Sequence, residues 1–334
     1  MTAKFTAAHS RLLELMADSH FHSGAELAEC VNISRSGVWK QIHSLQNLGI
    51  EIDAVTGKGY RLVKPLERLD KALIHAYLSP LSYRHLSQLG IQSEVDSTND
   101  DLMRQVAQQA PSGTVSLAEY QSAGKGRVGR QWISPFGRNV HLSLLWRFQG
   151  SPEVVSGLSL ATGVAVIKAL QVMGVEGAEV KWPNDILWQD RKLAGILVEV
   201  SGDSLGPCAV VIGVGVNLYM PSAQATDIDQ PWVDVHSIVD GQACSRNRMV
   251  AEILNQLLPM MMDFEQTGLQ PFLDEWRALD SMQGRRVMVS VGRNSRFSGV
   301  AAGISDDGRL LVQDADGVEH AFVSGEVSLR LAPE

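Results

Sequence analysis

Residues 181–200 read KWPNDILWQDRKLAGILVEV, and they set the pattern of the middle of the chain. Residues 181–185 place a cation and a carboxylate around a turn between two short strands. Lys192 then begins a strand, 193–199, whose almost continuous apolar run predicts burial on both faces. A lysine at the mouth of a buried strand is a candidate ligand for a carboxylate or a phosphate. The stretch therefore predicts a sheet with an anion site at one end.

The same alternation of strands and helices extends from about residue 68 to residue 280. Another buried strand ends in residues 213–217, where glycines allow close approach and Asn217 offers an amide. We expect an α/β or α+β domain with a mixed or mainly antiparallel sheet, and a kink at Pro259. The expected helices are 99–109, 152–173, 249–267 and 271–279, and the expected strands are 114–121, 139–148, 180–182, 186–188, 193–200 and 209–218.

A glycine-rich loop, residues 124–129, satisfies the pattern G-x-G-x-x-G. A dinucleotide site needs these glycines to open a helix, and Pro135 and Gly137 forbid a regular helix here. The Walker signature is also absent. What remains is a flexible loop whose Lys125, Arg127 and Arg130 can fold over an anionic ligand. A solvated basic turn is the alternative.

Ser97, Thr98 and Asn99 stand just before an expected helix. They offer hydroxyl and amide groups next to the free N–H donors of a helix end. Taken alone, such a segment is more often a simple N-cap than a ligand site.

The first 64 residues form a separate unit. A helix is expected over 7–17, Ser23 and Glu26 form a capping box, and Ser34 can cap a third helix that stops at Gly49. Two short helices with a tight turn are the helix-turn-helix pattern, and strands 50–55 and 60–63 flank a wing tip. Residues 1–65 carry a net charge of +1 and the remainder −9, within a total of −8.

The third helix presents a polar face opposite Val38, Ile42 and Leu45. Its polar side chains can enter a DNA major groove, while Lys58 on the wing can meet phosphate. A protein-binding winged helix is the alternative. The predicted DNA-binding residues are Ser34, Arg35, Ser36, Lys40, His43 and Lys58.

From residue 283 the pattern becomes all strand, with hairpin turns near residues 306–308 and 314–317. About 50 residues of this kind suggest a small β-barrel. We therefore predict an α/β multidomain protein with domains at 1–64, 68–280 and 283–334.

The composition excludes several classes of protein. Cys30, Cys208 and Cys244 are widely spaced and form no C-x-x-C pair, which argues against a disulfide scaffold or a zinc ribbon and favours a reducing cytoplasm. No run of about 18 apolar residues is present, so no membrane span or secretory signal is expected.

Together these motifs resemble one family, the bifunctional biotin–protein ligases and biotin operon repressors. The resemblance covers residues 97–99, 119–130, 181–185, 192–199 and 213–217 in order. Lipoate ligases share the middle fold, but the basic glycine loop and the Trp-Pro-Asn-Asp turn look like the biotin branch.

The resemblance implies a winged helix-turn-helix, a class II synthetase-like catalytic domain with a mixed or antiparallel sheet, and an SH3-like barrel. It also implies formation of biotinyl-5'-AMP from biotin and ATP, with Mg²⁺ carried on the nucleotide and no resident metal site. Lys192, Arg127 and Asp185 would be catalytic. Biotin would be held by Ser97, Thr98, Asn99, Gln121, Lys125, Gly126, Arg127 and Lys192; ATP and the adenylate would lie near Arg130, Lys181, Asp185, Asn217 and Trp232.

The implied partners are the biotin carboxyl carrier protein of acetyl-CoA carboxylase, operator DNA, and a second copy of the chain when the adenylate is bound. Two residues depart from the family pattern: Val128 replaces a basic residue, and Trp39 replaces a small polar one on the recognition helix. Two alternatives stay open, a ligase without an operator and a biotin-sensing repressor without ligation.

Overall fold

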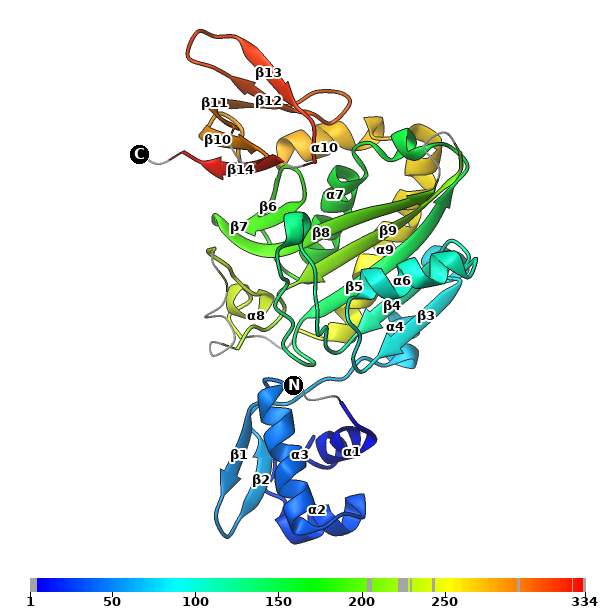
Figure 1. Ribbon diagram of the computed structural model, residues 1–334, viewed down its shortest axis with the longest axis vertical. Coiled ribbons are helices and arrows are strands. Elements are labelled where there is room, and N and C mark those ends of the chain that lie inside the picture. The colour runs from blue at the N-terminus through cyan, green and yellow to red at the C-terminus, as the bar shows by residue number, and fades with distance from the viewer. Residues whose placement is uncertain are drawn as a thin grey trace.

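The computed structural model describes residues 5–202, 206–221, 228, 230–241, 244–292, 295–325 and 327–332. Three units follow one another along its long axis, with the N-terminal unit at one end and the C-terminal strands at the other (Figure 1). The central unit is the largest and holds a seven-stranded sheet. The predicted three-part α/β architecture is confirmed.

The N-terminal unit packs three helices against a hairpin. The helices are α1 (Ala7–Leu15), α2 (Gly24–Val31) and α3 (Arg35–Asn47), and strands β1 (Ile52–Val55) and β2 (Gly59–Leu62) pair antiparallel. Ser23 caps α2 by accepting from the Glu26 N–H. The Glu26 carboxylate, however, lies 3.1 Å from His22 Nδ1, so the expected capping box forms only in its serine half.

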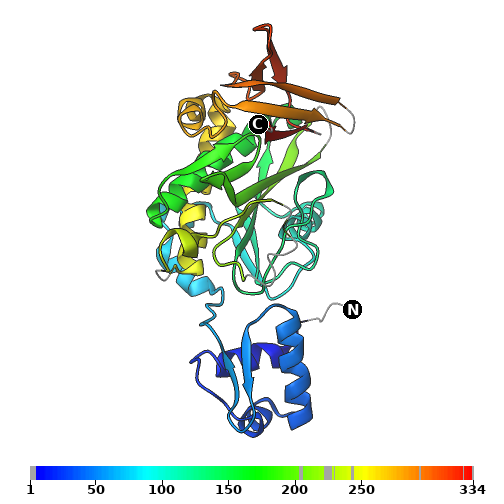
Figure 2. The same ribbon diagram turned by 90° about the vertical axis from the view of Figure 1, so that its left-hand side faces the viewer.

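The central sheet runs in the order β3-β4-β5-β9-β8-β7-β6. Strands β3 and β4 are parallel and the other neighbours are antiparallel, which makes the sheet mixed. Helices α7 and α9 pack on one face and α6 on the other (Figure 2). The central elements are α4 (Lys71–Tyr77), α5 (Pro80–His85), β3 (Gln88–Gln92), α6 (Thr98–Ala107), β4 (Thr114–Ala118), β5 (Val140–Phe148), α7 (Leu158–Val172), β6 (Ala178–Lys181), β7 (Asp185–Trp188), β8 (Arg191–Gly202), β9 (Cys208–Val216), α8 (Val235–Ile238), α9 (Arg246–Thr267) and α10 (Leu273–Ala278).

The central unit corrects two expectations. The single helix expected over 152–173 is a 3₁₀ turn, Pro152–Val155, followed by α7, because Gly157 adopts a φ of 77° between them. Strand β8 is not buried on both faces: Leu193, Ala194 and Ile196 are buried, but its other residues are half-buried or exposed. Helix α9 continues through Pro259.

The C-terminal unit is a five-stranded antiparallel sheet in the order β13-β12-β11-β10-β14. Its buried side chains, including Val287, Val289 and Val312, belong to the same hydrophobic core as the central helices. Trp182 reinforces the junction by donating from Nε1 to the Gly308 carbonyl at 3.1 Å. The strands are β10 (Arg286–Val291), β11 (Ser295–Ile304), β12 (Leu310–Gln313), β13 (Glu319–Phe322) and β14 (Val327–Leu331).

Within the described residues, none of the helices combines the length and the apolar character that crossing a membrane would require.

Candidate active site and DNA-binding face

One cavity of about 670 Å³ opens over the face of the central sheet that α6 partly covers. The glycine loop, the Trp-Pro-Asn-Asp turn and strand β14 complete its walls. The structure brings together at this cavity every residue that the sequence assigned to a small molecule. These residues are Ser97, Thr98, Asn99, Gln121, Lys125, Gly126, Arg127, Arg130, Lys181, Asp185, Lys192, Asn217 and Trp232.

The strand registers align five residues in a row across the cavity floor. His141 on β5 pairs with Gly215 on β9, which pairs with Gly195 on β8. Gly195 in turn pairs with Asp185 on β7, and Asp185 with Lys181 on β6. Because paired residues share a face of the sheet, charged groups stand at one end of the row and an imidazole at the other.

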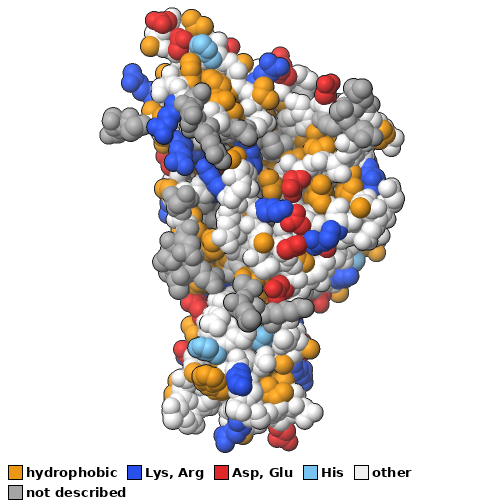
Figure 3. All heavy atoms as spheres, in the orientation of Figure 1, with side chains coloured by type: hydrophobic (Ala, Val, Ile, Leu, Met, Phe, Trp, Pro, Cys, Tyr) orange, Lys and Arg blue, Asp and Glu red, His pale blue; other side chains and the backbone are white. Residues whose placement is uncertain are grey.

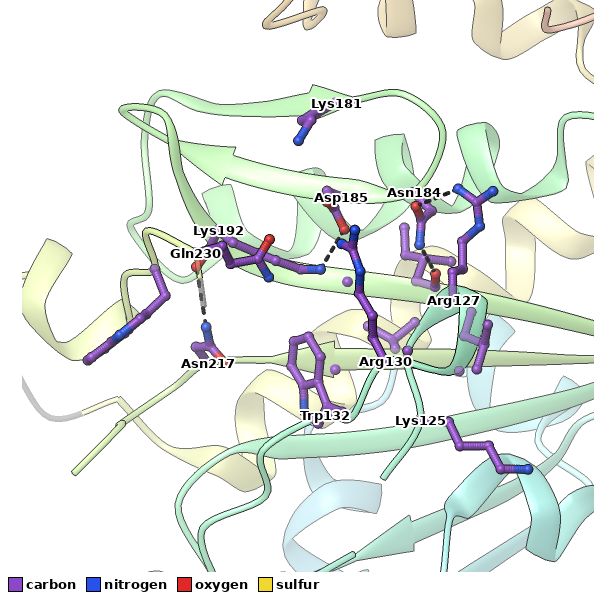
Figure 4. Close-up of a pocket in the computed structure, with 18 of the residues that line it drawn as sticks. Lys125, Arg127, Arg130, Trp132, Lys181, Asn184, Asp185, Lys192, Asn217 and Gln230 are labelled. Atoms are coloured by element: carbon purple, nitrogen blue, oxygen red, sulfur yellow. Dashed lines mark hydrogen bonds and ion pairs between the residues drawn. The ribbon is translucent and has the colours of Figure 1, made fainter. Parts of the chain in front are cut away.

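The two glycines in the middle of this row make room for Trp132. A Cβ atom added at Gly215 would lie 2.7 Å from the indole, and one at Gly195 would lie 3.1 Å from it. Figure 4 shows Arg130 and Trp132 pointing into the cavity from the loop that covers it. Trp132 is a site residue that sequence reasoning missed.

A β-bulge aims Lys192 at the cavity. Ile186 pairs with Ala194 but Leu187 pairs with Lys192, so Leu193 is an extra residue in β8. The bulge returns Lys192 to the same face as Gly195. There its Nζ lies 2.7 Å from Asp185 Oδ1, with about 15% of each side chain exposed.

The glycine loop is closed by its own backbone. The Gly126 N–H donates to the Arg130 carbonyl at 2.7 Å, and the Trp132 N–H donates to the Gly124 carbonyl at 2.9 Å. Its tip is a 3₁₀ turn, Arg127–Gly129, in which the exposed Val128 has a φ of 55°.

Arg127 ties this loop to two other parts of the chain. Its guanidinium donates to Asn184 Oδ1 at 3.1 Å and to the Gly325 carbonyl at 2.6 Å. Burial lowers the pKa of Arg127. The side chain therefore joins the loop, the Trp-Pro-Asn-Asp turn and the segment before β14, whereas Lys125 and Arg130 of the same loop are exposed.

The other basic residues differ in their partners. Lys125 ion-pairs with Asp100 on α6 at 2.5 Å and points along the edge of the cavity. Lys181 is half-buried at the end of the floor, and desolvation there lowers its pKa. Asn184, which sequence reasoning did not single out, exchanges hydrogen bonds with Ile196 in β8 and so fixes the turn that carries Asp185.

A buried polar cluster lies at the α6 side. The Thr98 N–H and hydroxyl donate to Gln121 Oε1 at 2.9 and 3.1 Å, and Ser143 Oγ lies 2.7 Å from Thr98 Oγ1. Asn99 donates from Nδ2 to Glu199 at 2.7 Å. Ser97 is buried but its side chain makes no capping hydrogen bond, so the N-cap explanation does not account for it.

Residues 231–233 are attached to the start of β8. The Lys192 N–H donates to the Pro231 carbonyl and the Val233 N–H donates to the Lys192 carbonyl, both at 2.9 Å. Asn217 Nδ2 donates to the carbonyl of Val233 at 3.2 Å. Trp232 is half-buried at the cavity wall.

His141 is a further residue that sequence reasoning missed. It lines the cavity, it is 1% exposed, and neither ring nitrogen has a hydrogen-bond partner among the described residues. Burial lowers its pKa to about 3, so the ring is neutral. The polar alternation of residues 139–148 was the signal that could have singled out His141 and Ser143.

Comparisons with known proteins match all three units. Models of a helix-turn-helix domain, the biotin/lipoate A/B protein ligase family and the biotin protein ligase C-terminal domain match residues 9–61, 91–217 and 284–330. A bifunctional ligase/repressor from Salmonella typhimurium is 38% identical, over 98% of this chain and 99% of its own. One from Escherichia coli is 37% identical, over 96% and 97%.

The chain belongs to the bifunctional ligase/repressor family of biotin protein ligases. Biotin ligation and repression are therefore its two activities. Among solved structures, an Aquifex aeolicus biotin protein ligase variant in complex with biotin is 25% identical, with a TM-score of 0.62. That structure matches 74% of this chain and 100% of its own.

The helix-turn-helix of this ligase/repressor carries the predicted DNA-binding residues on its surface. Ser34 caps α3 by accepting from the Gly37 N–H at 3.1 Å. Arg35, Ser36, Lys40 and His43 are exposed on α3, and Lys58 is exposed at the hairpin tip. In Figure 3 the lower lobe shows basic, histidine and hydrophobic side chains close together on one face.

Proposed function

We propose that this ligase joins biotin to AMP in the cavity of the central unit and passes the biotinyl group to a lysine of the biotin carboxyl carrier protein. One observation carries the proposal: Lys181, the Asp185–Lys192 pair and Arg127 converge at one end of a single cavity whose other end is a neutral polar cluster. This polarity matches a ligand that is anionic at one end and uncharged at the other.

Activation brings two anions together. A carboxylate oxygen of biotin attacks the α-phosphorus of ATP, the bond to pyrophosphate breaks, and a mixed anhydride forms. Positive charge fixed in a shielded cavity stabilises this transition state. Lys192, Arg127 and Lys181 supply that charge, and Arg130 extends it toward the nucleotide.

The polar cluster suits the ureido ring of biotin. Thr98, Gln121 and Ser143 place donors and acceptors a few ångströms apart with little exposure to water. A buried ligand carbonyl and two N–H groups need such partners. Asn217 and Trp232 lie at the wall beside Lys192 and suit the adenine and ribose.

In the second step the carrier lysine amine attacks the acyl carbon. An amide C–N bond forms, the bond from the acyl carbon to the phosphate oxygen breaks, AMP leaves, and the nitrogen loses a proton. The Asp185 carboxylate, 2.7 Å from Lys192 Nζ, is placed to orient the amine or to accept this proton. Exclusion of water by the glycine loop protects the anhydride from hydrolysis.

In this proposal Mg²⁺ binds to the phosphates of ATP. No group of three metal-ligating side chains occurs among the described residues. Asp185 and Asp190, which line the cavity, pair with Lys192 at 2.7 Å and with Arg285 at 2.6 Å. This donor set fits Mg²⁺ held mainly by the nucleotide, where it adds positive charge to the phosphates.

Repression uses α3 and the wing on operator DNA, with the adenylate as corepressor. A two-fold operator requires a dimer. The outer half of β8 pairs with β9 on one side only. On the other side β7 pairs up to Gly195 and Asn184 bonds Ile196, and no described strand pairs with residues 197–202. We assign this free edge to a second copy of the chain when the adenylate is bound. The free thiols Cys30, Cys208 and Cys244 suit a cytoplasmic location.

Release of pyrophosphate without a carrier tests the ligase chemistry. Purified protein with biotin and ATP should release close to one pyrophosphate per chain in a first turnover. A protein that only senses biotin would release none, whereas a ligase without an operator would release pyrophosphate and fail to bind operator DNA.

A further inference from the structure

One tryptophan of this protein is not accounted for by the fold or by the cavity. Of the seven tryptophans, all within the described residues, Trp39 alone is exposed, with 57% of its surface accessible. It lies on α3, whose core face is formed by Val38, Ile42 and Leu45. Replacing Trp39 would therefore remove little packing energy from the folded protein.

Trp39 is nevertheless held in a defined orientation. Its indole stacks on the His43 imidazole, one helical turn later, with ring centres 5.5 Å apart and planes 5° apart. Arg35, Trp39 and His43 follow at four-residue steps, so they form one stripe along the outer face of the helix. The stripe presents a flat apolar surface next to a guanidinium.

The surroundings of this stripe suit a polyanion. Helix α3 contains no Asp or Glu, and Ser36 and Lys40 are exposed beside the stripe. Lys58 is exposed on the hairpin tip of the same unit. A helix with this pattern in a helix-turn-helix enters the major groove, where its outward side chains reach the base edges.

We propose that Trp39 reads the 5-methyl group of a thymine in each half of the operator, with His43 as a positioning residue that holds the indole. This inference rests on the proposed binding of operator DNA. The thymine methyl is the apolar group displayed in the major groove, and an indole face is complementary to it. Arg35 and Ser36 remain available for polar base edges, and Lys40 for phosphate.

Uracil substitution isolates the methyl group. A duplex is first selected from a random pool by the full-length protein with biotin and ATP, and each thymine in it is then replaced by uracil. At one position per half-site, the loss of the methyl should weaken binding by wild type about four-fold, the value expected for one buried methyl. In Trp39→Ala the same replacement should change the affinity less than two-fold.

Lys40→Ala is the matched control, since it alters an exposed residue on the same helix. It should weaken binding to thymine and uracil duplexes equally and lower the salt dependence by about one phosphate contact. Both variants should keep the helical circular dichroism and the unfolding temperature of wild type, which shows that the DNA-binding unit folds, and they should release pyrophosphate like wild type. Trp39→Ala is measured at low salt, where phosphate contacts keep weak complexes measurable.

The experiment distinguishes a failure of operator binding from a failure of the role assigned to Trp39. Failure to enrich any duplex overturns operator binding and the proposal with it. Enrichment without a thymine that is sensitive to uracil, or equal sensitivity in wild type and Trp39→Ala, overturns the role of Trp39 and leaves operator binding intact.

Discussion

At the end of the cavity that would bind an anion, the positive charge of Lys192 is balanced by the carboxylate of Asp185, because the two side chains form an ion pair. Each side chain is about 15% exposed, and the two atoms are 2.7 Å apart. Truncating one partner of such a pair leaves the other partly buried and unpaired, which costs about 1–3 kcal/mol. We expect a ligand carboxylate or phosphate to replace Asp185 as the partner of Lys192.

Lys192→Ala should lower the rate of pyrophosphate release by about 100-fold or more, because it removes charge from the transition state. The free energy of unfolding should fall by about 1–3 kcal/mol, because Asp185 is left partly buried and unpaired, and the variant should still fold, since no large apolar volume is lost. Lys168→Ala is the control: Lys168 pairs with Glu275 on the surface, so its loss should leave both quantities unchanged. Unfolding of Lys192→Ala would indicate a structural role instead.

Asp280 gives stability a pH dependence at a single residue. Burial raises the pKa of Asp280 to about 6, and its Oδ2 has no partner among the described residues. A carboxyl whose pKa is raised on folding binds more protons in the folded state. Stability should therefore fall as the pH rises from about 4 to about 6 and stay low above that.

Asp280→Asn should remove this loss of stability at high pH. The amide oxygen can still accept from the Met282 N–H, now 2.9 Å away, without carrying a charge. Denaturant unfolding should show the variant more stable than wild type by up to about 2–3 kcal/mol at pH 8, with a much smaller difference at pH 4. An equal difference at both pH values would show that Asp280 does not titrate as described.

Among the secondary-structure elements, strand β8 has a different role in each half of its length. Its first half pairs with β7 and, through the bulge at Leu193, presents Lys192 to the cavity. Its second half continues beyond β7 and leaves an edge open. An unpaired edge is a template for another strand, and a charged side chain on it opposes such pairing.

Val200→Lys should weaken the dimer at least ten-fold, because Val200 lies on the open edge of β8 and is 39% exposed. Pyrophosphate release should be unchanged. Val172→Lys is the matched control, since Val172 is 49% exposed at the end of α7. Sedimentation equilibrium with biotin and ATP measures the effect; a dimer equally strong in both variants would exclude this edge.

Strand β8 shows which structural features the sequence pattern predicts and which it does not. The apolar run 193–199 correctly predicts a strand. The extra residue at Leu193 shifts which side chains face the cavity, and the amino-acid sequence of the strand gives no indication of this bulge. Helices α4 and α5 and strand β3 were not predicted, because each is short and only Ile74, Ser82 and Leu89 in them are buried. Asn184 and Trp132 act through contacts between distant segments, which spacing along the chain cannot show.

At the scale of the whole molecule, the DNA-binding unit is built partly on the catalytic unit. Phe136, in the segment that leads from the glycine loop to β5, is fully buried in the core of the N-terminal unit and stacks on Phe5 with ring centres 4.6 Å apart. Lys64, at the end of the same unit, donates to the Tyr219 hydroxyl at 2.6 Å. The loop over the cavity is therefore supported from the DNA-binding side.

Removal of residues 1–64 should abolish operator binding and leave ligation reduced but present. The proposed ligand residues all lie beyond residue 64, but Phe136 would become exposed and the glycine loop would lose its support. Biotin binding should weaken by about ten-fold, which isothermal titration measures. Unchanged biotin affinity would contradict a supporting role for this contact, and retained operator binding would contradict the DNA-binding assignment.

The central claim is that one adenylate serves both ligation and repression. The direct measurement is the fluorescence anisotropy of a labelled operator duplex with protein, biotin and limiting ATP, before and after a biotin carrier domain is added. The account predicts high anisotropy that falls as the carrier is biotinylated, and no fall with a carrier whose acceptor lysine is replaced by arginine. Anisotropy that stays high while the carrier is fully biotinylated and ATP is exhausted would contradict the claim.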